Sequence, residues 1–480
     1  MSRVSIWTIL AAVLAGAALG QSSETPIAFE AADVHVSPKV RNPSMASGGL
    51  RGTRYLVRQA TLADLISLAY DIDNDKILGG PSWLDIKRFD VSARAPAGSN
   101  PEQAKLMLQT LLAQRFSLKI HKDSKELAGF VAQALKATRR RKVALVGSSR
   151  GGNAIRSYLT NGGGAEFVSH AVLCGTPNKG VVNSDSLLVG SEFNGGYSFL
   201  KDLNAGPDDR IAGVEMMAIR SDKEDKFSQP DGRFVGAPGK PTGVSYDSSE
   251  LRGAKNVILD GLDHREVAFN KLAFAAMYEF IADRQPASMF IAQEPLPILN
   301  GKVTGIADGT YTNLAVADAE VEIYEVDAKS GERKSTAPLH RKTTGQDGAW
   351  GPFVGRSDAY YEFVLRMAAQ PITHTYRSPF LRSSDVVHLR PGVFAKGDET
   401  AAAIVSMSRP RGYFGVGRDK FSLDGKTPPG INDGVPGVSV GKLAFDASPR
   451  TVLAVFNNET IPTRTWPVKD NHLVIAEFLN

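Results

Sequence analysis

Cysteine is almost absent from this sequence of 480 residues, since Cys174 is the only one. A single cysteine cannot form a disulfide within the chain, so the fold must be stabilised by core packing. Cys174 lies in the apolar run SHAVLCGTP, where a free cysteine is expected in the core. Histidines are also few, and the isolated His35 and His121 indicate no metal site in the first part of the chain. We expect neither a bound metal nor a cofactor.

Long runs of one charge are missing as well. The 56 Lys and Arg residues nearly balance the 51 Asp and Glu residues, and the net charge is +5. The densest basic cluster, Arg139 to Lys142, is expected at a solvated helix end, where cations offset the helix dipole. The sequence therefore gives no support for nucleic-acid binding.

Long apolar runs are confined to the N-terminus, and no later segment reaches the about 18 residues typical of a membrane-spanning helix. Arg3 is followed by an apolar run from Val4 to about Leu19 and then by small and polar residues, which is the pattern of a secretory signal peptide over residues 1–20. No cysteine near the cleavage site supports a lipoprotein anchor. We expect cleavage near Gly20 and a secreted or periplasmic protein with no transmembrane span.

Residues 25–126 predict a small α+β unit of short strands and two helices. The helices are expected to begin near Thr61 and at Pro101, where Asn100 is the N-cap. The stretches FEAADVHVSP, LADLISLAYDID, ILGGPSWLDIKRFDVSARAPAG and LLAQRFSLKIHKDSKEL resemble a family of secreted acidobacterial proteins of unknown function. The chain departs from that pattern after about Leu127.

Residues 127–290 alternate between predicted strands and predicted helices, which is typical of a parallel sheet covered on both faces. The stretch KVALVGSSRGGNAIRSYL has an apolar strand, a turn of the form G-x-S-x-G and a helix. In that context the pattern predicts a strained turn that presents Ser149 as a nucleophile, with the Arg150 N–H as one oxyanion donor. The alternatives are a plain Gly-rich turn and, less favoured, Ser148 as nucleophile.

A nucleophilic serine needs a base, and the base needs an orienting carboxylate. His264 follows the last predicted strand of this unit, whereas His170 lies inside a strand and is a poor candidate. The loop after the preceding strand offers Asp222, Asp225 and Asp231. We favour Asp225, because DKFSQP resembles a lipase turn, and Asp222 stays open as the alternative. Asp263 adjoins His264 in the sequence, which places it badly for orienting that ring.

Together these residues resemble the α/β-hydrolase superfamily, and specifically secreted bacterial lipase-like and esterase-like proteins with β-rich C-terminal domains. The resemblance covers about residues 126–283, and the tail from about residue 296 fits the same layout. It implies hydrolysis of a carboxylic ester or lipid, with Ser149 as nucleophile, His264 as base and Asp225 as orienting acid.

The segment before Ser149 departs from that superfamily. No apolar strand leading to a His-Gly loop precedes the serine, although that loop normally supplies the second oxyanion donor. The chain therefore resembles a join of two incomplete units, from a recombined gene or an assembly error. We expect the strand KVALV to lie at an exposed sheet edge. Loss of one oxyanion donor typically costs roughly a hundred- to a thousand-fold in rate.

Residues 296–480 contain short predicted strands separated by Gly-rich and Thr-rich segments, which predicts an all-β region. We expect a split near residues 391–398 into units 296–394 and 395–480. The first resembles a transthyretin-like or carboxypeptidase-regulatory-like sandwich. Five aromatic residues are expected in the core, with contact to a lipid or carbohydrate surface as the alternative: Trp350, Tyr360, Tyr361, Tyr376 and Trp466.

The sequence thus predicts a multidomain α/β and β protein with a small α+β unit, a partial α/β-hydrolase parallel sheet and a β-sandwich region. The favoured function is an exported serine ester hydrolase with impaired oxyanion stabilisation. The alternative is a secreted binding or structural protein without catalysis. Acyl transfer would use the same three residues.

Overall fold

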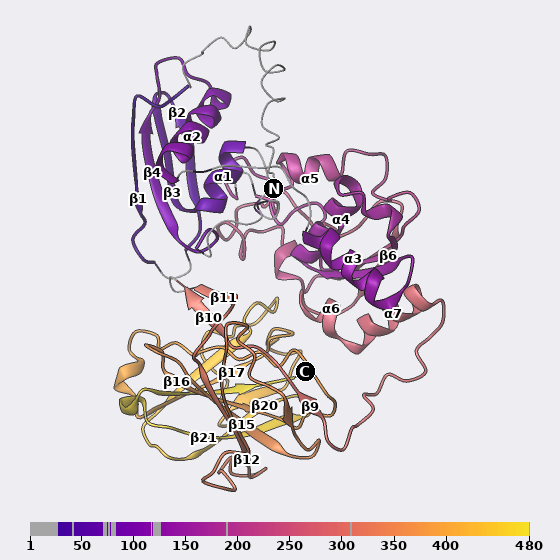
Figure 1. Cartoon of the computed structure of the whole chain (residues 1–480), viewed down its shortest axis with the longest axis vertical. Helices are drawn as coiled ribbons and strands as arrows, with labels where there is room; N and C mark the ends of the chain where they lie inside the picture. Colours follow the sequence, from indigo (N-terminus) through magenta and orange to yellow (C-terminus); the bar gives the residue numbers. More distant parts are fainter. Residues whose placement is uncertain are drawn as a thin grey trace, which may run out of the picture.

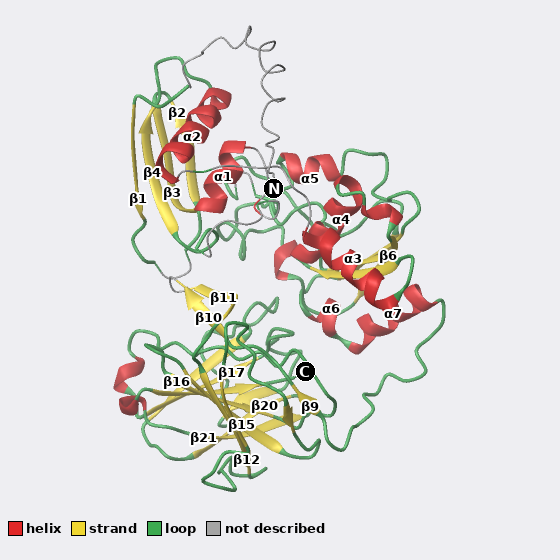
Figure 2. Ribbon diagram, viewed as in Figure 1, coloured by secondary structure: helices red, strands yellow, loops and turns green. Residues whose placement is uncertain are grey.

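The computed structural model shows three bodies: an α+β unit, a parallel-sheet unit and a β-rich region (Figures 1 and 2). This is the predicted fold class. No helix within the described part of the chain is both long and apolar enough to span a membrane. The predicted signal peptide lies outside the described residues, which are 27–40, 43–70, 74, 77, 83–116, 118, 126–188, 191–307 and 310–479.

The N-terminal unit is an antiparallel sheet with two helices on one face. Its strand order is β1 (Ala31–Val36), β4 (Arg88–Arg94), β3 (Arg54–Thr61) and β2 (Ala46–Arg51). Helices α1 (Leu62–Tyr70) and α2 (Pro101–Phe116) bury Leu65, Leu108 and Leu112 against this sheet. Thr61 and Asp64 cap each other at the start of α1, and Asn100 caps α2. The predicted closing strand of this unit falls almost wholly outside the described residues.

The second unit is a four-stranded parallel sheet. Its order is β5 (Val143–Ser148), β6 (Val168–Cys174), β7 (Glu215–Ser221) and β8 (Lys255–Leu259). Helices α3 (Glu126–Thr138) and α4 (Arg150–Asn161) cover one face. Helices α6 (Glu266–Phe269) and α7 (Lys271–Ala282) cover the other, and α5 (Ser198–Leu203) lies in the β6–β7 connection. Cys174 is fully buried, as predicted.

Strand β5 is the edge of this sheet, as the missing upstream strands predict. Val143 and Leu145 pack with α3 and α4, whereas Val146 points to the other face and is 52% exposed. The residues that pack under α7 come from β6, β7 and β8, and none comes from β5. One face of the edge strand is therefore uncovered.

The β-rich region is built around one seven-stranded sheet. It joins β12, β13, β15 and β16 to β17, β19 and β22, so the sheet crosses the predicted split near residues 391–398. Strands β16 and β22 pair in parallel, and so do β22 and β17. The units 296–394 and 395–480 thus share a sheet. Their division into two separate domains remains a prediction. The strands are β9 (Ile298–Leu299), β10 (Thr304–Ala307), β11 (Thr310–Ala315), β12 (Glu320–Val326), β13 (His340–Thr343), β14 (Phe353–Val354), β15 (Tyr360–Arg366), β16 (Ile372–Arg377), β17 (Ala403–Ser408), β18 (Phe421–Leu423), β19 (Val440–Phe445), β20 (Thr451–Phe456), β21 (Glu459–Arg464) and β22 (His472–Glu477).

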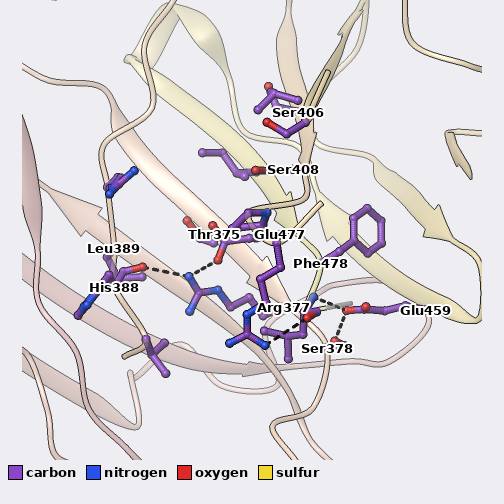
Figure 3. Close-up of a pocket in the computed structure, with 18 of the residues that line it drawn as sticks. Thr375, Arg377, Ser378, His388, Leu389, Ser406, Ser408, Glu459, Glu477 and Phe478 are labelled. Atoms are coloured by element: carbon purple, nitrogen blue, oxygen red, sulfur yellow. Dashed lines mark hydrogen bonds and ion pairs between the residues drawn. The ribbon is translucent and has the colours of Figure 1, made fainter. Parts of the chain in front are cut away.

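The five aromatic residues singled out in the sequence of this region lie mainly in its core. Trp350, Tyr361 and Tyr376 are at most 1% exposed, and Tyr360 and Trp466 are partly buried against the core. The core interpretation therefore holds for Trp350, Tyr361 and Tyr376, and contact of the tail with a lipid or carbohydrate surface stays a prediction. A groove of about 1540 Å³ with a mixed polar and apolar lining also lies on this region, and Tyr360 is one of its lining residues. Figure 3 shows Arg377, Ser406 and Ser408 in this groove.

Candidate active site

The turn between β5 and α4 is a strained elbow with Ser149 at its tip. Ser149 has a φ of 53° and a ψ of −121°, a conformation that a non-glycine residue rarely adopts. A Cβ on Gly147 would stand 2.6 Å from the Gly152 nitrogen, and one on Gly152 would stand 1.9 Å from the Thr176 Oγ1. A Cβ on Gly151 would meet open space. The turn therefore requires glycine at positions 147 and 152. The G-x-S-x-G pattern contains Gly147 and Gly151, but position 151 has room for a side chain.

Three side chains from separate loops meet at this elbow. The Ser149 Oγ is 3.0 Å from the His264 Nε2, and the His264 Nδ1 is 2.8 Å from the Asp225 Oδ2. Asp225 follows β7 and His264 follows β8, and their side chains are about 95% buried. Phe227 packs edge-on against the imidazole, with ring centroids 4.6 Å apart. The structure thus brings together the three residues that the sequence predicted.

The Asp225 carboxylate has a second anchor. Its Oδ1 accepts a hydrogen bond of 2.8 Å from the Phe227 N–H, and it thereby caps the short 3-10 helix η3 (Lys226–Ser228). One oxygen is fixed by the backbone while the other faces the imidazole. This leaves the carboxylate little freedom to rotate away from His264.

The competing residues have other partners. Asp222 accepts hydrogen bonds from the Gly261 N–H (3.2 Å) and the Ser221 hydroxyl (3.1 Å), and so ties the acid-bearing loop to the histidine-bearing loop. Burial opposes ionisation of Asp222, but the backbone N–H groups of Lys223 and Gly261 outweigh it and hold its pKa below the usual range. Asp231 pairs with Arg233, and His170 packs on Phe280.

Cys174 offers no second nucleophile. It lies at the end of β6 and is fully buried. Burial raises the pKa of its thiol to about 12, which leaves almost none of the reactive thiolate at neutral pH.

The predicted oxyanion donor stands at the start of α4. Arg150 is the first residue of that helix, where backbone N–H groups lack an intrahelical acceptor and favour negative charge. Its side chain turns to Glu192 instead, with the Nε 2.5 Å from the Oε1 of that buried carboxylate. Any oxyanion role of Arg150 would therefore use its backbone.

The sequence analysis missed a buried charge cluster beside His264. Asp263 and Glu266 flank the histidine, and Arg409 and Arg418 reach them from the β-rich region. The Arg409 Nη2 lies 2.7 Å from the Glu266 Oε1, and the Arg418 Nη1 lies 2.9 Å from the Glu266 Oε2. Arg409 is about 143 residues from Glu266 in the sequence, so no local pattern could have revealed the pairing.

Asp263 acts as a structural cap in this cluster. Its Oδ1 accepts hydrogen bonds from the N–H groups of Arg265 and Glu266, and its Oδ2 accepts one of 2.6 Å from the Tyr413 N–H. These partners agree with the expectation that Asp263 does not orient the imidazole. Burial and then the Asp263 carboxylate raise the pKa of Glu266, and the two guanidinium groups oppose that rise.

The described residues contain no group of three or more His, Cys, Asp or Glu side chains that could hold a metal ion. The large groove of the β-rich region includes Arg265 but neither Ser149 nor His264 among its lining residues. Nucleophilic catalysis needs a nucleophile within hydrogen-bonding reach of a base. The elbow provides this pair in Ser149 and His264, so the elbow rather than the groove is the candidate active site.

Two family models match the chain. Residues 298–393 match a lipase C-terminal domain, and residues 63–158 match a protein family of unknown function designated DUF3738. The second match extends past Leu127 and through the elbow, beyond the range predicted for the N-terminal resemblance. The acidobacterial origin of that resemblance stays a prediction. No curated protein matches the chain.

Solved structures with partial similarity include three chains, two of them lipases. The Bacillus licheniformis lipase BlEst2 in propeptide form is 18% identical over 43% of this chain and 47% of its own, with a TM-score of 0.27. Aspergillus fumigatus lipase B is 16% identical over 34% of this chain and 42% of its own, with a TM-score of 0.25. The product of lin2722 from Listeria innocua is 15% identical over 34% of this chain and 66% of its own, also with a TM-score of 0.25. This chain thus covers less than half of either lipase.

Proposed function

We propose that this protein is an exported serine hydrolase of carboxylic esters. The observation that carries the proposal is the continuous hydrogen-bonded relay from Ser149 through His264 to Asp225. Three side chains separated by 115 and 39 residues along the chain meet at hydrogen-bonding distance behind a strained elbow. The match of residues 298–393 to a lipase C-terminal domain supports a hydrolase relationship independently of this geometry.

In the proposed reaction, the Ser149 Oγ attacks the acyl carbonyl while the His264 Nε2 takes its proton. Asp225 keeps the imidazole in the tautomer with the proton on Nδ1 and stabilises the imidazolium that forms. The imidazolium then gives the proton to the leaving alcohol, and water releases the acyl group by the same route in reverse. Asp225 is the acid in this scheme because Asp222 is engaged with Gly261 and Ser221.

The Arg150 N–H is the proposed oxyanion donor at the helix start. The strands that would lead to a second donor are replaced by the N-terminal unit. We therefore expect a rate roughly a hundred- to a thousand-fold below that of a hydrolase with two donors. Secretion or periplasmic export rests on the predicted signal peptide over residues 1–20.

The groove favours a second role for the β-rich region, which is contact with a polar surface ligand. Six cationic side chains and only two carboxylates line it, together with serine and threonine hydroxyls. Figure 3 shows Thr375, Ser406 and Ser408 in this groove; Thr375 lies on β16, the two serines lie on β17, and β22 separates these strands. The cations and hydroxyls suit a hydroxyl-rich or anionic carbohydrate, and the apolar side chains beside them, such as Val387, Leu389 and Leu473, would contact its apolar face. If the triad is inactive, this non-catalytic binding role becomes the leading function.

The proposal is tested by following hydrolysis of p-nitrophenyl butyrate and p-nitrophenyl dodecanoate. We expect turnover by the parent protein and none above background by Ser149→Ala. Equal turnover by both proteins, with both shown to unfold cooperatively, would refute the proposal. The ratio of the two rates gives the preferred acyl length.

A further inference from the structure

The charge cluster beside His264 carries a conclusion that rests on the proposed function and extends it. We propose that Arg409 and Arg418 of the β-rich region are positioning residues for His264, so that the triad is complete only when this region is docked. Neither residue touches the reacting atoms. They act through Asp263 and Glu266, the neighbours of the catalytic histidine in the sequence.

The first part of the argument is how the histidine loop is held. Within its own unit the loop is capped by Asp263 and continues into α6, a helix of only four residues. A helix this short has little stability of its own. Within the same unit the Glu266 Oε2 also accepts a hydrogen bond of 2.9 Å from the Asp263 N–H. The β-rich region adds Arg409, Arg418 and the Tyr413 N–H as partners of the two carboxylates. The loop that aims His264 thus depends on a partner outside its own unit.

The second part is that the acid-bearing loop reaches the same segment. The Lys226 Nζ donates to the Gly437 carbonyl at 3.2 Å and lies 4.4 Å from the centre of the Tyr413 ring. The Arg265 guanidinium lies 4.7 Å from the same ring centre. Lys226 follows Asp225 and Arg265 follows His264, so the neighbours of both catalytic residues converge on Tyr413. One segment of the β-rich region therefore sets the spacing between the two loops.

The third part is electrostatic. Asp263 is fully buried and Glu266 is 9% exposed, and two carboxylates this close are costly unless cations compensate them. Arg409 is 3% exposed at its side chain and Arg418 is 23% exposed. Removal of one guanidinium leaves uncompensated negative charge beside the imidazole, which favours the imidazolium over the neutral base. A protonated His264 cannot act as base, so activity would begin at a higher pH.

The charged groups that face this site come from both sides of the junction and all enter the pH argument. The acidic ones are Glu224, Asp225, Asp263, Glu266 and Asp419, and the basic ones are Lys226, Arg265, Arg409 and Arg418. Only Arg409 and Arg418 contact Glu266 directly among the described basic side chains. Substitutions of Arg409 and Arg418 therefore test the positioning role most directly.

Arg418→Gln is the main test variant, because Arg418 is partly exposed and the fold should tolerate its loss. Arg418→Lys is the conservative rescue. Arg411→Gln is the matched control from the same segment, since the Arg411 Nη1 donates to the Leu479 carbonyl at 3.4 Å rather than to Asp263 or Glu266. We expect Arg418→Gln to lower kcat about tenfold with KM nearly unchanged and to move the acid limb of the kcat/KM profile upward by at least half a pH unit. Arg418→Lys should restore most of both, and Arg411→Gln should match the parent.

A second readout does not depend on turnover. In ¹⁵N-labelled protein the Nδ1 proton of His264, held by Asp225, should give a downfield resonance that is absent from His264→Ala. In Arg418→Gln this resonance should shift or broaden. A cooperatively folded Arg418→Gln with an unchanged resonance and an unchanged pH profile would overturn the positioning role. A parent protein that shows the resonance but hydrolyses no ester would instead overturn the proposed function alone.

Discussion

The two sides of the parallel sheet differ in how well they are covered and tethered by the rest of the molecule. On the serine side, β5 is an edge strand with one uncovered face, and Val146 is 52% exposed. On the histidine side, the loops of Asp225 and His264 are tied to each other through Asp222 and to the β-rich region through Arg409 and Arg418. The residues of the proposed proton relay are therefore held on several sides, while the strand before the proposed oxyanion donor is an uncovered edge. If the proposed function holds, the relay can form without the upstream strands.

The largest effect is expected at the relay itself. Ser149→Ala removes the attacking atom and His264→Ala removes the base, so each should lower kcat by at least about a thousand-fold. The double variant should be no worse than either single one, because the two residues act as a unit. Initial rates with p-nitrophenyl butyrate measure this, and multiplicative losses in the double variant would contradict a shared relay.

The next effect separates the two candidate acids. Asp225→Asn keeps the shape but favours the wrong imidazole tautomer, and should lower kcat by up to about ten-thousand-fold. Asp222→Asn should leave most activity, because Asp222 does not contact His264 and ties the loops together instead. The reverse ranking of the two variants would reassign the acid to Asp222.

Asp222 also provides a pH test of loop tethering. Its folded pKa is depressed, so the stability it contributes is present above its unfolded value of about 3.9 and is lost as pH falls through the lower folded value. The parent should therefore unfold at higher urea than Asp222→Asn near neutral pH, and the gap should close as the pH falls through the lowered pKa of Asp222. A gap that is independent of pH would indicate a purely steric role.

A smaller effect is expected from the elbow glycines, measured as the free energy of unfolding. Gly152→Ala places a Cβ 1.9 Å from the Thr176 Oγ1 and should destabilise by about 1–3 kcal/mol, with loss of activity. Gly151→Ala meets open space in a helix and should be neutral or up to about 1 kcal/mol stabilising. Equal effects of the two substitutions would show that the packing between α4 and Thr176 can accommodate an added Cβ at position 152.

The smallest effect concerns the open edge. Val146→Lys places a charge on the uncovered face of β5, and should change the unfolding free energy by less than about 0.5 kcal/mol while lowering aggregation. Light scattering during thermal unfolding measures the second part. A large loss of stability would mean that another part of the chain covers Val146.

The local features of this site could be predicted from the sequence, whereas its contacts with distant segments could not. The elbow at Ser149 and the position of His264 after the last strand follow from patterns within about twenty residues, which is the range over which periodicity and turn chemistry act. The choice between Asp222 and Asp225 required the loop geometry, because both lie in one polar segment.

Contacts between distant segments were not predictable in the same way. The parallel pairing of β16 with β22 joins segments about a hundred residues apart, and its hydrogen bonds leave no signature in either segment. The arginines at 409 and 418 lie in the Gly-rich segment RPRGYFGVGRD, where the sequence alone suggests a solvated turn. Their role depends on the docking of two units, which no local pattern records.

The most direct test of the relay is labelling of the purified protein with a fluorophosphonate, followed by mass spectrometry of the modified peptide. This probe reacts with an activated serine and needs no knowledge of the natural ester. The account predicts one label per chain on Ser149, lost in Ser149→Ala and slowed in Arg418→Gln. A cooperatively folded protein that takes up no label, or takes it up at another residue, would contradict it.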